Sequence, residues 1–171
     1  RKWIVKPGNS MRFGLVTYQW GKDWELDTLL KNCMQANVQG VELRTTHAHG
    51  VEPELNQDQR QEVQQKFANS AVVLVGIGSN ERYDNPDPTI VQQAIERTKQ
   101  FIRLSHDVGG TGVKVKPDRF YDNIPHEKTI EQIGTALNEL GSYGAGWGQQ
   151  IRLEVHGQCS ELPTIKAIME I

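Results

Sequence analysis

The segment "IRLEVHG", residues 151–157, alternates between apolar and polar side chains as a β-strand with two different faces does. Arg152, Glu154 and His156 would share one face, because successive side chains of a strand point to opposite sides. Aliphatic side chains would share the other face, and these are Ile151, Leu153 and Val155. A strand whose polar face is entirely charged or titratable predicts either a solvated surface or the lining of a site.

The same alternation occurs in "GVELR", residues 40–44, and in "GVKVKP", residues 112–117. Helical patterns separate these segments, and a strict alternation of strand and helix predicts parallel strands joined by helical crossovers. We expect strands near residues 13–18, 40–44, 72–77, 112–116 and 151–155. We expect the aliphatic side chains of the alternating strands to face the helices: Val41, Leu43, Val113, Val115, Leu153 and Val155.

Charged strand faces decide between the two architectures that such an alternation allows. An open parallel sheet covered by helices on both sides offers no place for them. The segment "GIGSNE", residues 76–81, also has Glu81 where a dinucleotide-binding fingerprint has its third glycine. We therefore expect an α/β fold of the (β/α)₈ TIM barrel type, whose lumen accepts polar side chains.

Five β-α units do not close a barrel that normally takes roughly 250 residues. We expect an incomplete barrel with its C-terminal units beyond residue 171, although a second copy of the chain could also complete the sheet. The expected domain division is an N-terminal extension at residues 1–11 and the N-terminal part of the barrel at residues 12–171.

Composition restricts the partners that the chain is expected to bind. The 171 residues carry a formal net charge of −2 and include only two cysteines. Without a basic cluster or a long apolar run, the sequence indicates neither nucleic-acid nor membrane binding. We expect a soluble protein, cytoplasmic or exported if an upstream signal was removed, and self-association into a homo-oligomer is compatible with this composition.

Residues late in the strands of a barrel converge at its carboxyl end. One pocket is therefore expected to be lined by Arg44, Lys116, Glu154 and His156. Residues earlier in the strands have a second interpretation as structural ion pairs, such as Glu42 with Lys114 or with Arg152.

Two histidines lie in "TTHAHGVE", residues 45–52, directly after the second expected strand. His47 and His49 could share a metal ion, or one of them could contact a substrate. We favour substrate contact and assign it to His47. A solvated polar loop is the alternative.

The segments "NVQGVELR", residues 37–44, and "LEVHG", residues 153–157, resemble the xylose-isomerase-like TIM barrels, which include the sugar phosphate isomerases/epimerases. The resemblance implies that a glutamate ending the fifth strand binds a divalent metal ion. That position falls on Glu154, and the remaining ligands would lie past Ile171. Manganese, magnesium, cobalt and zinc are all compatible with oxygen ligation.

The implied activity is a divalent-metal-dependent isomerisation or epimerisation of a sugar or sugar phosphate, with proton transfer through an enediolate. Glu154 would be both metal ligand and catalytic residue, and His156, Lys116, Arg44 and His47 would bind the carbohydrate substrate. Two alternatives stay open, namely an endonuclease-IV-like phosphodiesterase and a non-catalytic barrel that binds carbohydrate.

Overall fold

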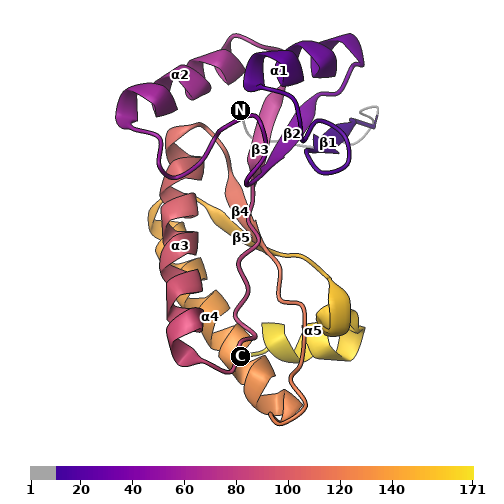
Figure 1. The fold of residues 1–171 in the computed structure, drawn as a ribbon, viewed down its shortest axis with the longest axis vertical. Coiled ribbons are helices and arrows are strands. Elements are labelled where there is room, and N and C mark those ends of the chain that lie inside the picture. Colours follow the sequence, from indigo (N-terminus) through magenta and orange to yellow (C-terminus); the bar gives the residue numbers. More distant parts are fainter. Residues whose placement is uncertain (1–10) are drawn as a thin grey trace.

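The computed structural model describes residues 11–171, so the extension expected at residues 1–11 lies almost wholly outside the described residues. Strands and helices alternate along the chain (Figure 1). In chain order they are β1 (Gly14–Val16), α1 (Leu26–Gln35), β2 (Gly40–Arg44), α2 (Gln57–Ala68), β3 (Val73–Gly78), α3 (Pro88–Asp107), β4 (Gly112–Val115), α4 (His126–Gly146), β5 (Gln150–Leu153), the 3₁₀ helix η1 (Gly157–Ser160) and α5 (Leu162–Met169).

The five strands form one parallel sheet in the order β1-β2-β3-β4-β5. Each strand is therefore hydrogen-bonded to the next one in sequence, with a helix as the crossover between them. This arrangement corresponds to five consecutive units of a (β/α)₈ barrel, as expected from the sequence. Because all strands are parallel, their carboxyl ends and the loops that follow lie at the same edge of the sheet.

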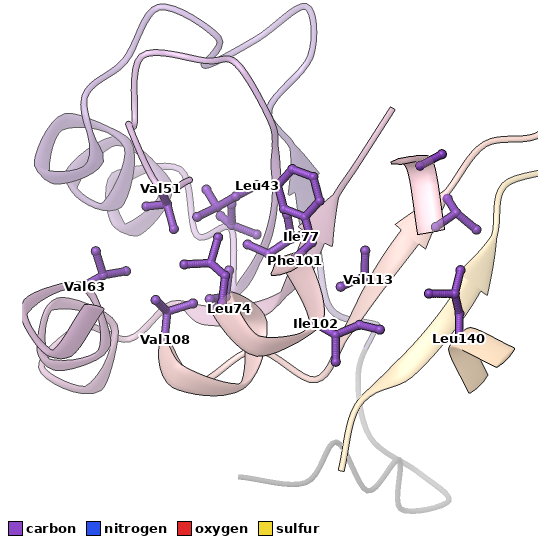
Figure 2. Close-up of a cluster of buried hydrophobic side chains, with 14 of the residues drawn as sticks. Leu43, Val51, Val63, Leu74, Ile77, Phe101, Ile102, Val108, Val113 and Leu140 are labelled. Atoms are coloured by element: carbon purple, nitrogen blue, oxygen red, sulfur yellow. The ribbon is translucent and has the colours of Figure 1, made fainter. Parts of the chain in front are cut away.

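The aliphatic face of the sheet packs against the helices, as the alternation predicts. Val41, Leu43 and Val113 are fully buried in a core that also includes Phe101 and Ile102 of α3 (Figure 2). Burial of each such side chain contributes about 1.5–3 kcal/mol relative to exposure, so this face supplies much of the driving force for folding.

One residue expected on this face is not there. Val155 is 56% exposed, whereas Leu153 packs against the core. The strand β5 ends at Leu153, and the chain then leaves the sheet toward η1. The alternation continues in the sequence for two residues longer than the strand itself.

Local signals fix where two of the helices begin. Asn56 caps α2 with a reciprocal capping box to Gln59. Asp87 accepts a hydrogen bond from the backbone N–H of Thr89 at 2.8 Å, and Pro88 occupies the first turn of α3.

Among residues 11–171, no helix has both the length and the apolar character needed to cross a bilayer.

Strand β3 contains an irregularity that the sequence does not reveal. Val41 pairs with Leu74, but the next residue of β2, Glu42, pairs with Gly76. Val75 is thus an extra residue that shifts the alternation of β3. As a result Leu74 belongs to the core, while Gly76 pairs with Glu42 on the polar face.

The glycines of this face provide the space for a long cationic side chain. Arg152 donates from Nη1 to the carbonyl of Val75 at 3.0 Å and from Nη2 to the hydroxyl of Thr111 at 2.6 Å. A Cβ on Gly76 would lie 2.8 Å from Nη1 of Arg152 and would also collide with the carbonyl oxygen of Gly112. Only glycine is compatible with this crossing.

Gly76→Ala is therefore expected to lower the free energy of unfolding by about 1–3 kcal/mol, because backbone or Arg152 must move to accept the methyl group. Urea denaturation followed by circular dichroism measures the change. Gly141→Ala in α4 is the matched control, since its Cβ would meet nothing within 4 Å, and it should stabilise by roughly 0.5–1 kcal/mol. Equal effects of the two substitutions would contradict the crossing.

Candidate active site

Three charged side chains meet on the polar face of the sheet. Nζ of Lys114 lies 2.7 Å from Oε1 of Glu42 and 2.9 Å from Oε2 of Glu154. The side chain of Lys114 therefore links Glu42 of β2 to Glu154, the residue that follows β5. To reach Glu42 it passes over β3, which lies between β2 and β4. The Glu42–Lys114 ion pair, expected as the second interpretation of these residues, is confirmed. Lys114 forms a further ion pair with Glu154.

The contact between Lys114 and Glu42 over β3 depends on Gly78, which pairs with both Arg44 and Lys114 in the sheet. A Cβ on Gly78 would lie 2.9 Å from Oε1 of Glu42. Burial alone would lower the pKa of Lys114, but the hydrogen bonds that its ammonium donates to Glu42 and Glu154 outweigh burial and raise that pKa. Lys114 therefore stays charged between the two carboxyl groups.

Arg44, at the end of β2, belongs to a second group of contacts. Its guanidinium donates from Nη2 to Oδ1 of Asn80 at 2.7 Å and lies over the ring of Tyr18, 4.4 Å from the centroid. Its backbone N–H donates to the hydroxyl of Thr17 at 2.9 Å. The loop after β1 and the loop after β3 are thus both tied to the end of β2.

The two histidines after β2 differ in their environments. Both ring nitrogens of His49 are engaged, one with the carbonyl of Arg44 at 2.7 Å and the other accepting from the N–H of Val51 at 3.0 Å. Nδ1 of His47 is 3.3 Å from the hydroxyl of Thr17, and burial, followed by nearby Arg44, lowers the pKa of His47. His49 therefore stabilises the conformation of its loop. For His47 only Nδ1 has a hydrogen-bond partner within residues 11–171, and its contact with a substrate stays a prediction.

His156 belongs to a third group, which the sequence pattern does not suggest. Nδ1 of His156 is 2.9 Å from Oδ1 of Asp118, and Nη1 of Arg82 is 2.9 Å from Oδ2 of the same carboxylate. The backbone N–H groups of Asp118 and Arg119 in turn donate to the buried carboxylate of Asp84, at 2.7 and 3.0 Å. Three loops therefore fix the orientation of the imidazole.

The structure places all of the expected site residues at or beyond the carboxyl ends of the strands. Lys116 is partly exposed, and its backbone N–H donates to the carbonyl of Glu81 at 3.0 Å. Within residues 11–171, no hydrogen bond or ion pair joins any two of Arg44, Lys116, Glu154 and His156. They share one edge of the sheet but belong to separate clusters.

Sequence reasoning overlooked Asp84 and Asp118, because acidic residues in a loop are usually solvated. The only signal was their position in the loops that follow β3 and β4. Tyr83 lies in the same loop as Asp84 but is fully buried, and its hydroxyl lies 2.8 Å from that of Thr98. Its role is to anchor the loop on α3.

Lys114→Met is expected to destabilise the protein by about 1–3 kcal/mol, because it leaves two partly buried carboxylates facing each other without a cation. Chemical denaturation at neutral pH measures this loss. Lys99→Met is the matched control, since Lys99 also joins two glutamates, Glu96 and Glu139, but these are about half exposed. We expect the control to cost less than about 1 kcal/mol. An equal or smaller loss for Lys114→Met would be the contrary result.

The Asp118 cluster should make stability depend on pH in the acid range. Burial acts to raise the pKa of Asp118, but His156 and Arg82 outweigh it and hold that pKa below its ordinary range. Its stabilisation is therefore complete above the ordinary aspartate pKa of about 3.9 and disappears as pH falls through the lower folded-state value.

We expect Asp118→Asn to destabilise at pH 7 and the difference from wild type to shrink as pH falls below about 4. Thermal unfolding across pH 2–7 measures it. Asp122→Asn is the control, because Asp122 is exposed and has no side-chain hydrogen bond or ion pair within the described chain. A difference for Asp118→Asn that does not vary with pH would exclude the ionic contribution.

Donors for a metal ion are few in the part of the chain that the structure describes. Residues 11–171 contain no group of three or more His, Cys, Asp or Glu side chains placed to hold a metal ion. Glu154 offers one carboxylate, and one of its two oxygens is bound by Lys114. These residues alone therefore do not form a metal site.

Several solved proteins share the fold of this chain. A zinc-bound IolI protein has 18% sequence identity to the chain and a TM-score of 0.78, over 94% of this chain and 58% of that one. D-psicose 3-epimerase from Clostridium cellulolyticum H10, solved with D-tagatose, has 15% identity and a TM-score of 0.73, over 93% and 60%. The probable 3-DHS dehydratase AsbF from Bacillus anthracis has 13% identity and a TM-score of 0.73, over 94% and 58%.

At these identities the likeness shows a shared fold, and the chain spans about three fifths of the length of these proteins. No curated protein sequence is significantly similar to the chain. A family model described as xylose isomerase-like TIM barrel matches residues 30–171, which is most of the chain. The chain therefore belongs to the xylose isomerase-like TIM barrel family.

Proposed function

We propose that this chain is part of a sugar isomerase or epimerase in which Glu154 transfers a proton at a carbon next to a carbonyl group. The observation that carries the proposal is the state of the Glu154 carboxylate. Lys114 holds Oε2 at 2.9 Å, whereas Oε1 makes no hydrogen bond or ion pair within residues 11–171. One oxygen is thus fixed and the other is available, at the carboxyl edge of the sheet.

An available carboxylate oxygen suits the chemistry of this proton transfer. A proton next to a carbonyl is weakly acidic, and its removal leaves an enediolate whose negative charge must be stabilised. The ammonium of Lys114 fixes the direction from which Oε1 approaches the substrate carbon. Positioning of this kind contributes to catalysis because it removes the need to orient the base during the reaction.

The other site residues would bind the rest of the substrate. Arg44, held by Asn80 and Tyr18, is placed to donate to a hydroxyl or phosphate oxygen. The side chain of Lys116 and the ring of His47 supply further polar groups at the same edge. His156 is oriented by Asp118, which leaves Nε2 as the ring nitrogen that can contact substrate.

A divalent metal ion, if bound at Glu154, would stabilise the enediolate charge. The carboxylate of Glu154 would be one of its ligands in this chain, and the remaining ligands would come from outside residues 11–171, since these form no complete metal site. Manganese, magnesium, cobalt and zinc remain predictions, as does the identity of the carbohydrate. The sugar epimerases among the similar structures support a carbohydrate rather than a nucleic acid as substrate.

The proposal is tested by exchange of the substrate proton with solvent. Full-length protein in D₂O with a panel of ketoses and aldoses should replace the hydrogen next to the carbonyl by deuterium, which proton NMR detects. Glu154→Gln keeps the shape but removes the base, so the exchange rate should fall by at least about 100-fold. The metal content should fall as well.

Glu131→Gln is the control, because Glu131 is exposed on α4, and it should leave both measurements unchanged. Exchange that persists in Glu154→Gln would show that another residue removes the proton. An absence of exchange with every carbohydrate would overturn the proposed function itself.

A further inference from the structure

A cavity borders two of the clusters of the candidate active site. It is formed between the loop after β3, the first half of α3 and Tyr121 in the segment after β4, and has a volume of about 340 Å³. Figure 1 shows these long loops running from the sheet to the starts of α3 and α4. We call it the flank cavity, and its size lies within the range of small-molecule sites, about 300–1,000 Å³.

The polar groups of the flank cavity include an unpaired acceptor. The side chain of Glu81 is partly buried, and its carboxylate makes no hydrogen bond or ion pair within residues 11–171. Burial raises the pKa of Glu81, and the charge of Arg97 only partly offsets this. A ligand that supplies a hydrogen-bond donor would give this carboxylate a partner that residues 11–171 do not provide.

The cations of the cavity are already neutralised. Arg82 pairs with Asp118 at 2.9 Å, and Arg97 pairs with Glu54 at 2.6 Å. The carboxylates of Glu81 and Asp84 line the same space. An anionic ligand would therefore meet two carboxylates and no uncompensated cation, which disfavours phosphates and organic acids.

A neutral polyol suits the remaining chemistry. Its hydroxyl groups can donate to Glu81 and accept from the free N–H groups of Arg82 and Arg97. Its C–H groups can pack against Ile90 and Ala94, which form the apolar part of the lining. We propose that the flank cavity is a second binding site, for a neutral polyhydroxylated molecule about the size of one monosaccharide.

The cavity shares three lining residues with the clusters of the candidate active site, namely Asn80, Arg82 and Asp84. Arg82 holds Asp118, which orients His156, and Asn80 accepts the hydrogen bond from Arg44. A polyol in the flank cavity would touch both of these residues directly. Binding of a polyol would therefore affect the conformation of the loop after β3, which carries Asn80 and Arg82.

The test uses 1,5-anhydro-D-glucitol, a pyranose without a carbonyl group, so that turnover cannot interfere. It is titrated into ¹⁵N-labelled full-length protein, and amide chemical shifts are followed. We expect saturable shifts at residues 80–85 and 90–97. Glu81→Gln, which keeps the shape, should weaken binding about tenfold through loss of a charge-assisted hydrogen bond. Ile90→Trp, which fills the cavity, should abolish the shifts.

Gln92→Ala is the matched control, because Gln92 is exposed on the same helix but does not line the cavity. It should bind the polyol as wild type does, and the dispersed amide spectrum of each variant verifies folding. Unchanged affinity in both Glu81→Gln and Ile90→Trp would overturn the proposal, as would shifts that only Glu154→Gln removes. Tighter binding of inorganic phosphate at the same amides would overturn the neutral class of ligand. None of these outcomes alters the exchange test of the proposed function.

Discussion

The ammonium of Lys114 compensates the charges of the two glutamates on the polar face of this sheet. Two carboxylates, Glu42 and Glu154, lie close to each other on a face that is largely removed from water, and their repulsion would favour protonation or separation of the strands. Lys114 of β4 contacts both carboxylates, at 2.7 and 2.9 Å, and so links β4 to β2 on one side and to the end of β5 on the other. The available oxygen of Glu154 is a consequence of this arrangement.

The ion pairs on this face require backbone space as much as charge. Glu42 reaches Lys114 across Gly78, and Arg152 reaches Val75 across Gly76. The bulge at Val75 brings both glycines onto the polar face, while Leu74 remains in the core. A single extra residue in β3 therefore links the apolar packing on one face to the charge network on the other.

The sequence allowed the parallel sheet to be predicted from the alternation of strands with helices. The buried face, and Lys114 as one of two possible partners of Glu42, followed from the period of two within the strands. It did not allow the bulge to be predicted, since "VVLVGIG", residues 72–78, is apolar throughout and has no alternation to interrupt. The pair of His156 with Asp118 was also beyond prediction. It joins two irregular segments 38 residues apart, which no local pattern relates.

Strands and loops contribute differently to the candidate site. The position of Glu154 follows from a strand and from ion pairs within the sheet, whereas the position of His156 follows from carboxylates that bind loop backbone. Asp84 is buried and accepts two N–H groups of the segment after β4, so the loops after β3 and β4 are fixed to each other. A buried carboxylate with two backbone donors is costly to release. The loops at the candidate site are therefore fixed by hydrogen bonds to Asp84, as Glu154 is fixed by its ion pair with Lys114. Only the strands follow a regular sequence pattern.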